Sequence, residues 1–213
     1  MKSVTTAQVE HVKKMARAKG VSKDLFQDNF IDGGLCAVAI DAAKSGSRLK
    51  VIPPIVAPDG WGGRTHFVEV EVDENQPWSD AVNAAGPNTP DNYDIHKVGD
   101  LYLSTDKGRR RKVKMVLVNL ANGGDFVKAV AWANQFDLKR TSPRQVFAIG
   151  KKFPELHQEL GMDPMYVVAS EECTFGGYRR VCSVWWGGSD READLDWVGG
   201  VRYSDGWVAF LCE

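Results

Sequence analysis

The order in which helical and strand-like segments follow one another constrains this fold most. Helical patterns occupy residues 1–46, strand-like segments dominate 48–120, two helical stretches lie between 125 and 160, and strands return from 165 to the end. Helices and strands therefore come in groups, and no strand–helix–strand unit repeats. This order favours an α+β fold with a largely antiparallel sheet over a doubly wound parallel sheet.

Two strand predictions come from alternation of apolar and polar residues. In "THFVEVEVDE" Val68, Val70 and Val72 alternate with two glutamates, which is the pattern of a half-buried strand. Residues 100–120 predict a hairpin whose turn lies at Lys107–Gly108, because apolar residues alternate on both sides of it. Further strands are predicted in "MYVVASEE", "RRVCSVWW" and "WVAFLCE".

Helix starts are marked by capping residues. Asp125 precedes an apolar-periodic stretch, and Ser142 followed by Pro143 is a strong start signal, since proline suits the first helical position. Pro154 interrupts the second stretch and predicts two short helices, 143–151 and 154–160. A further short helix is predicted after Pro77.

Composition excludes several classes of protein. Hydrophobic content of 43% and charged content of 26% are ordinary for a globular protein, and the formal net charge of −1 gives no bulk attraction to nucleic acid or anionic membrane. We find no apolar run long enough to span a membrane, and the first 20 residues lack the apolar core of a signal peptide. We therefore expect synthesis in the cytoplasm, without membrane insertion, and with display on a virion or cell surface left open.

Metal and disulfide chemistry are not expected. The four cysteines, Cys36, Cys173, Cys182 and Cys212, form no CxxC pair, and the four histidines are scattered, so no zinc site is predicted. Cys173 and Cys182 flank a predicted turn and would face each other across it. Two reduced thiols are favoured over a disulfide because the chain has no export signal.

The remaining candidate motifs favour simple structural roles. The basic run Lys107–Lys114 has no interleaved aromatic residues, which favours a solvated hairpin tip over a nucleic-acid site. Gly123–Gly124 precede a helix, and a tight turn is favoured there over an anion site. The segment "DREADLD" offers paired carboxylates, yet it matches no calcium loop and has no catalytic partner residues. No enzyme activity and no cofactor are predicted.

The C-terminal segment, about residues 181–213, holds four of the seven tryptophans. Its apolar spacing is irregular, which predicts a loop-rich region that is neither a clean strand nor a helix. Apolar residues would anchor such a region in the core, and the residues between them would project outward. The predicted anchors are Trp185, Trp186, Ala193, Leu195, Val198, Trp207 and Phe210. The predicted outward residues are Gly187, Asp190, Glu192, Asp194, Asp196, Trp197, Gly200, Arg202, Tyr203, Ser204 and Asp205.

Two interpretations of this pattern are equally supported by composition. The outward residues form a recognition surface, or they are solvated polar residues of a loop-rich core closure.

Residues 138–213, from "DLKRTSPRQVFAIGKKFPELHQELG" to "VRYSDGWVAFLCE", resemble the variable proteins of diversity-generating retroelements. The resemblance rests on the overall pattern of this region. It implies a C-type-lectin-like domain over residues 50–213, with a mostly antiparallel sheet and two or three helices, preceded by a helical segment over residues 1–49.

The same resemblance implies a function. In such proteins the C-terminal segment is rewritten by reverse transcription with errors at template adenines, and a fixed apolar scaffold presents the rewritten positions to a ligand. Asparagine codons altered at adenines yield Asp, Gly, Ser, Tyr or Arg, which fill the gaps between the anchors here, whereas Trp197 requires a lysine or arginine codon. The expected partner is a protein or other macromolecule, bound without catalysis.

Departures from the lectin pattern limit what the resemblance implies. "NQPWSD" and "DLDWVGG" are not the calcium-binding motifs of sugar-binding lectins, so calcium-dependent sugar binding is not expected. The alternatives are a viral or cellular structural subunit without a diversified site, and a hydrolase that uses the acidic cluster.

Overall fold

The computed structural model describes residue 14 and residues 55–102, 110–202 and 204–212. The chain divides into two compact units between Ile52 and Pro53, and all described residues except Lys14 belong to the second. The predicted N-terminal helices, Cys36 and the predicted turn at Lys107–Gly108 lie outside the described residues.

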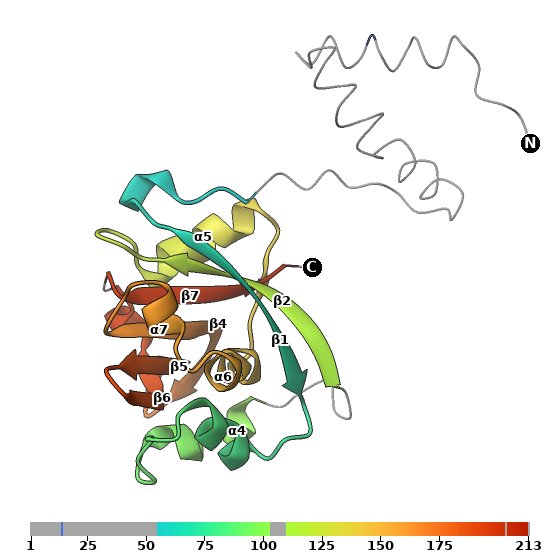
Figure 1. Ribbon diagram of the computed structural model, residues 1–213, viewed down its shortest axis with the longest axis vertical. Coiled ribbons are helices and arrows are strands. Elements are labelled where there is room, and N and C mark those ends of the chain that lie inside the picture. The colour runs from blue at the N-terminus through green and yellow to red at the C-terminus, as the bar shows by residue number, and fades with distance from the viewer. Residues whose placement is uncertain (1–13, 15–54, 103–109, 203, 213) are drawn as a thin grey trace, which may run out of the picture. The chain divides into compact units, whose positions relative to one another are not determined.

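A sheet of seven strands forms the centre of the second unit (Figure 1). Its strands are β1 (Thr65–Asp73), β2 (Arg110–Asn119), β3 (Lys139–Arg140), β4 (Met165–Phe175), β5 (Tyr178–Gly187), β6 (Asp190–Trp197) and β7 (Gly206–Leu211). The order across the sheet is β1-β2-β7-β4-β5-β6, and β3 also pairs with β7. Every pairing is antiparallel except β4 with β7. This arrangement confirms the α+β class and the mostly antiparallel sheet.

Four α-helices lie within the described residues. They are α4 (Trp78–Ala85), α5 (Phe126–Gln135), α6 (Pro143–Lys152) and α7 (Leu156–Glu159). Helices α4, α5 and α6 begin at predicted positions, and α7 begins two residues after the predicted start at Pro154. The Asp125 carboxylate accepts the backbone N–H of Lys128 at 2.8 Å and so caps α5. At the start of α6 the Ser142 N–H donates to the Gln145 side-chain oxygen at 2.9 Å.

Two apolar cores cover opposite faces of the sheet. Along β7, Trp207, Ala209 and Leu211 belong to the first core, and Val208 and Phe210 belong to the second, as the alternation of a strand requires. Helices α4 and α6 pack in the first core and α5 packs in the second. Figure 1 shows α5 apart from α4 and α6, with the sheet between them.

The predicted hairpin over residues 100–120 is wrong. Gly99–Leu101 is a short 3-10 helix, and both edges of β2 are occupied, by β1 on one side and β7 on the other. Glu69 faces Lys114 and Glu71 faces Lys112 across the β1–β2 pair. Opposite charges on facing strands stabilise this distant pairing.

The prediction of an irregular segment after Trp186 is also wrong in part. Asp190–Trp197 is a regular strand, β6, paired with β5 from Gly187↔Asp190 to Arg180↔Trp197. Ala193 and Leu195 are buried in the first core. The acidic residues that alternate with them, Glu192, Asp194 and Asp196, therefore lie on the other face of the strand. The short 3-10 helix η5 (Val198–Gly200) follows β6.

Candidate ligand-binding groove

A groove of about 520 Å³ lies on the face of β4, β5 and β6 that belongs to the second core. We call it the acidic groove. Its lining residues are Tyr166, Ser183, Trp185, Glu192, Asp194, Asp196, Trp197, Gly200 and Val201. This volume lies within the usual range for ligand sites.

Strand alternation and the η5 segment build this groove. Ser183 and Trp185 point to one face of β5, and the three acidic residues point to the same face of the neighbouring strand β6. Val198, the first residue of η5, and Val201, which follows η5, are buried in the second core and hold this part of the chain in place. Helix α5 contacts β7 in that core, and the groove opens beside it over β5 and β6.

Glycines hold the aromatic side chains of the groove in place by leaving room for them. A Cβ added at Gly187 would lie 2.2 Å from the Trp185 ring, and one at Gly199 would lie 2.7 Å from the Trp197 ring. A Cβ at Gly206 would likewise lie 2.5 Å from the Tyr166 hydroxyl oxygen. Each ring is thus packed directly on glycine backbone, which only a residue without a side chain permits.

The groove is acidic because three carboxylates line it and no positively charged side chain does. Its charged lining residues are Glu192, Asp194 and Asp196, and no Lys, Arg or His is among the lining residues. Burial, aided by the neighbouring Asp194, raises the pKa of Asp196 to about 6 against the opposing effects of the Ser183 hydroxyl and Arg180. At neutral pH Asp196 is therefore ionised, and keeping this charge half-buried lowers the free energy of unfolding.

This cost predicts a stability that depends on pH. The Asp196 pKa is higher in the folded chain than in the unfolded one, so the folded state binds more protons between pH 4 and 6 and gains stability as the pH falls through that window. Asp196→Asn should raise the free energy of unfolding by about 1–2 kcal/mol at pH 7.5, a figure reduced for partial solvent screening.

Urea denaturation of both proteins at pH 7.5 and pH 4.5 measures this difference, which should shrink at the lower pH. Asp190→Asn is the matched control, because Asp190 is an exposed aspartate on the same strand. An equal effect of the two substitutions at pH 7.5 would contradict the assignment to Asp196.

The structure divides the eleven predicted outward residues among several places. Glu192, Asp194, Asp196, Trp197 and Gly200 line the acidic groove. Arg202 and Ser204 line a shallower depression of about 420 Å³ beside Gly123, Gly124 and Asp125. Asp190 lies at the β5–β6 turn, Asp205 is half-buried, and Tyr203 lies outside the described residues.

Gly187 differs from what was predicted for an outward contact position. Because the Trp185 ring rests on it, any side chain at this position must displace the ring. Gly187 thus supports the Trp185 ring, and its role as a ligand contact stays a prediction.

Six of the seven predicted anchors are buried. Trp186, Ala193, Leu195 and Trp207 belong to the first core, and Val198 and Phe210 belong to the second. Trp185 is the exception, since it is half-buried and lines the acidic groove instead. Adjacent residues of a strand point to opposite faces, so Trp185 and Trp186 cannot both enter one core.

Sequence reasoning missed Tyr166, Ser183 and Val201 as lining residues. Ser183 and Trp185 share a strand face, which alternation within "VCSVWW" could have indicated. Tyr166 is brought in by the pairing of β4 with β5, where it faces Trp185. That pairing is not visible in the local pattern of either strand.

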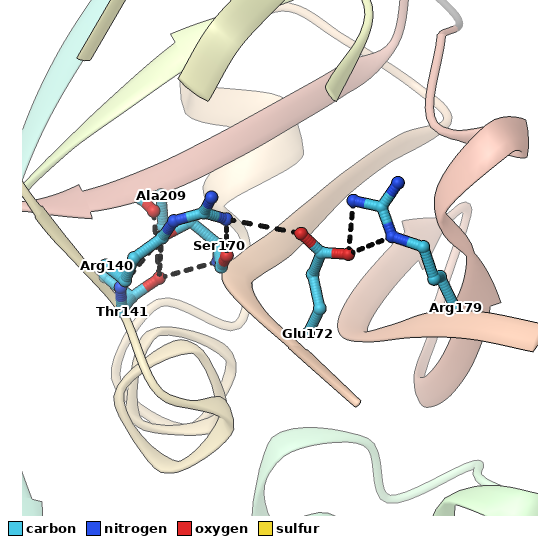
Figure 2. A network of polar contacts seen from close by, with 6 residues as sticks. All are labelled: Arg140, Thr141, Ser170, Glu172, Arg179 and Ala209. Carbon is cyan, nitrogen blue, oxygen red and sulfur yellow. Dashed lines mark hydrogen bonds and ion pairs between the residues drawn. The ribbon is translucent and has the colours of Figure 1, made fainter. Parts of the chain in front are cut away.

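A second polar cluster lies away from the groove and is fully paired (Figure 2). Thr141 and Ser170 are both buried: the Thr141 N–H donates to Ser170 Oγ at 2.7 Å, and the Ser170 N–H donates to Thr141 Oγ1 at 3.0 Å. The Thr141 hydroxyl donates to the Ala209 carbonyl at 2.8 Å. Glu172 joins the cluster through ion pairs with Arg140 and Arg179. These contacts tie the start of α6 to β4 and β7, which is a structural role.

A pocket of about 670 Å³ lies between α4, α6 and β1. Its charges are mixed: Asp73 pairs with Arg110 at 2.8 Å, and Lys152 donates to the Glu69 carbonyl at 2.7 Å. Because acidic and basic side chains both line this pocket, it selects a ligand by charge less clearly than the acidic groove does.

The acidic groove presents carboxylate, hydroxyl and aromatic side chains to a ligand. Its lining residues include no cysteine and no histidine. The Ser183 hydroxyl lies 3.5 Å from the Asp194 carbonyl and also interacts with the Asp196 carboxylate. Within the described residues, no group of three His, Cys, Asp or Glu side chains is arranged to hold a metal ion. Cys173, Cys182 and Cys212 are free thiols, and burial raises the pKa of Cys182.

Comparisons of this chain with protein-family models, with curated proteins and with solved structures found no match. In the part of the chain that the structure describes, no helix is long and apolar enough to cross a membrane.

Proposed function

We propose that this chain is a non-catalytic binding protein whose C-terminal segment presents a diversified ligand-contact surface on a C-type-lectin-like scaffold. The observation that carries the proposal is the separation of the two residue sets within one segment. Five of the eleven predicted contact residues line one groove, and six of the seven predicted anchors are buried in the two cores.

The scaffold suits such a role because the groove rests on paired strands. β6 is hydrogen-bonded to β5 along its length, and the buried Ala193 and Leu195 hold it on the first core. A rigid surface limits the ordering cost that binding imposes. Substitutions on the groove face leave these buried contacts in place.

A library experiment tests whether the contact positions tolerate change. Simultaneous randomisation of positions 192, 194, 196, 197 and 200 should leave most members soluble with cooperative melting, because surface substitutions usually change stability by less than about 0.5 kcal/mol. A matched library at the anchors 186, 193, 195, 207 and 210 should leave few folded members. Equal losses in both libraries would contradict the proposed division.

The diversification itself is tested in DNA. The region downstream of the gene should contain a near-copy of the sequence that encodes the C-terminal segment, with mismatches confined to template adenines and a reverse transcriptase gene nearby. A genome without such a repeat would contradict diversification, and the binding role would then depend on the groove alone.

A further inference from the structure

We propose that the acidic groove binds a basic side chain, lysine or arginine, presented on the surface of a protein partner. This inference rests on the proposed binding function. It specifies which class of ligand the contact residues present in this chain would bind.

Charge complementarity is the first argument. Glu192, Asp194 and Asp196 line the groove without a positive lining residue. Three arginines lie on the paired strands and none lines the groove: Arg179 pairs with Glu172. Arg180 donates to the Leu195 carbonyl at 3.4 Å, and Arg191 donates to the Ala85 carbonyl at 2.6 Å. Arg180 offsets part of the Asp196 charge, so the three carboxylates of the groove keep a net negative charge for a ligand to neutralise.

The aromatic lining is the second argument. Trp197 is 54% exposed, and Trp185, which also lines the groove, is half-buried. Ring faces attract guanidinium and ammonium groups, and the attraction grows when the cation is partly desolvated. Because Gly187 and Gly199 support these two rings, the rings are positioned before a ligand arrives.

The half-buried Asp196 carboxylate is the third argument. It lies beside Asp194 on the same face of β6, so two negative charges share a partly desolvated site. A neutral or anionic partner would bury this charge further without a counter-ion, which is costly. A basic side chain would relieve the repulsion instead.

An open groove with an exposed tryptophan at its margin fits a protein partner better than a small free amine. Tryptophan is among the residues that contribute most to protein–protein binding, and it does so beside well-packed pockets. The ligand that fits the groove is therefore a Lys or Arg side chain of a protein.

Panning of a displayed random-peptide library against the immobilised full chain tests this inference. We expect enriched peptides that share a lysine or arginine, and loss of binding when that residue is replaced by glutamine. Enriched peptides without any basic residue would overturn the cationic inference and leave the proposed binding function standing. If no peptide is enriched, and a neutral oligosaccharide such as chitotetraose binds instead, the inference also fails.

Variants of the groove sharpen the test. Asp194→Asn and Glu192→Gln should each weaken binding of an enriched basic peptide about ten-fold, the effect of one charge-assisted contact. Asp190→Asn is the matched control and should leave affinity unchanged, because Asp190 does not line the groove. Equal affinities for all three variants would overturn the inference.

The aromatic supports have their own controls. Gly199→Ala should weaken peptide binding, because the added Cβ displaces the Trp197 ring without changing any charge. Gly60→Ala should not, since nothing lies within 4 Å of a Cβ at that exposed position. Melting temperatures of both variants show whether the fold is kept, and unchanged affinity of a folded Gly199→Ala variant would contradict the role of the ring.

The pH dependence of binding gives an independent readout. The groups that act on Asp196 are Asp194 on β6 and Ser183 and Arg180 on β5. Glu192 on β6 and Tyr166 on β4 also line the groove. As the pH falls from 7.5 to 5, Asp196 takes up a proton, so affinity for a basic peptide should fall, and it should fall less in Asp196→Asn. A peptide affinity that rises on acidification would overturn the inference.

Discussion

Trp207→Ala is expected to lower the free energy of unfolding by about 3–5 kcal/mol, the cost of removing a buried aromatic side chain and leaving a cavity. Trp207 is 1% exposed and lies on β7, between β2 and β4 in the sheet. Its indole N–H donates to the Met162 sulfur at 3.3 Å, and the Arg64 guanidinium lies 5.6 Å from the ring centroid. The substitution therefore removes contacts at the centre of the sheet. For a chain of this length the melting temperature should fall by roughly 10 °C.

Trp197→Ala is the matched control, because it removes the same side chain from the rim of the groove. Trp197 is 54% exposed, so the free energy of unfolding should change by less than about 1 kcal/mol. Urea denaturation followed by circular dichroism measures both variants on one scale. Equal destabilisation by the two substitutions would contradict the separation of anchors from contact residues.

Local patterns of sequence were enough to predict most individual elements. The alternation of Val68, Val70 and Val72 predicted β1, and the capping residues Asp125 and Ser142 predicted where α5 and α6 begin. These features depend on neighbours in sequence, because a strand face and a helix cap are set within a few residues.

The pairing of strands could not be predicted in the same way. Residues 110–119 were assigned to a hairpin with the segment just before them, yet β2 pairs with β1 and β7, which are distant in sequence. The parallel contact of β4 with β7 is equally non-local. An alternating strand pattern says which face is buried and does not say which strand lies beside it.

In the C-terminal segment the local sequence pattern led to the wrong secondary structure, a loop in place of strand β6. The alternation in "DREADLD" was present, but the glycines and aspartates around it favoured a loop prediction. Gly187 was counted as a contact residue because glycine fits an adenine-altered codon. In the structure it supports the Trp185 ring, a close approach that only the neighbouring side chain reveals.

Thr141→Val should also be strongly destabilising, by about 2–4 kcal/mol, although it keeps the shape of the side chain. The Thr141 hydroxyl accepts the Ser170 N–H at 3.0 Å and donates to the Ala209 carbonyl at 2.8 Å, in a site where both Thr141 and Ser170 have no exposed surface (Figure 2). Valine leaves that buried N–H without its acceptor and removes a donor from the carbonyl, and each unsatisfied buried group costs about 1–3 kcal/mol.

The position of this contact makes the loss matter for the whole sheet. The register of β4 against β5 shifts between Val168 and Glu172, so Ser170 lies where the regular ladder is interrupted. Thr141 supplies the hydrogen bonds there and joins β4 to β7 just before α6 begins. Thr174→Val is the matched control, since Thr174 is an exposed threonine on β4, the strand that holds Ser170. Its effect on the free energy of unfolding should stay within about 0.5 kcal/mol. If denaturation curves of the two valine variants coincide, the Thr141 hydroxyl does not hold β4 to β7, and the interrupted ladder must be stabilised by apolar packing alone.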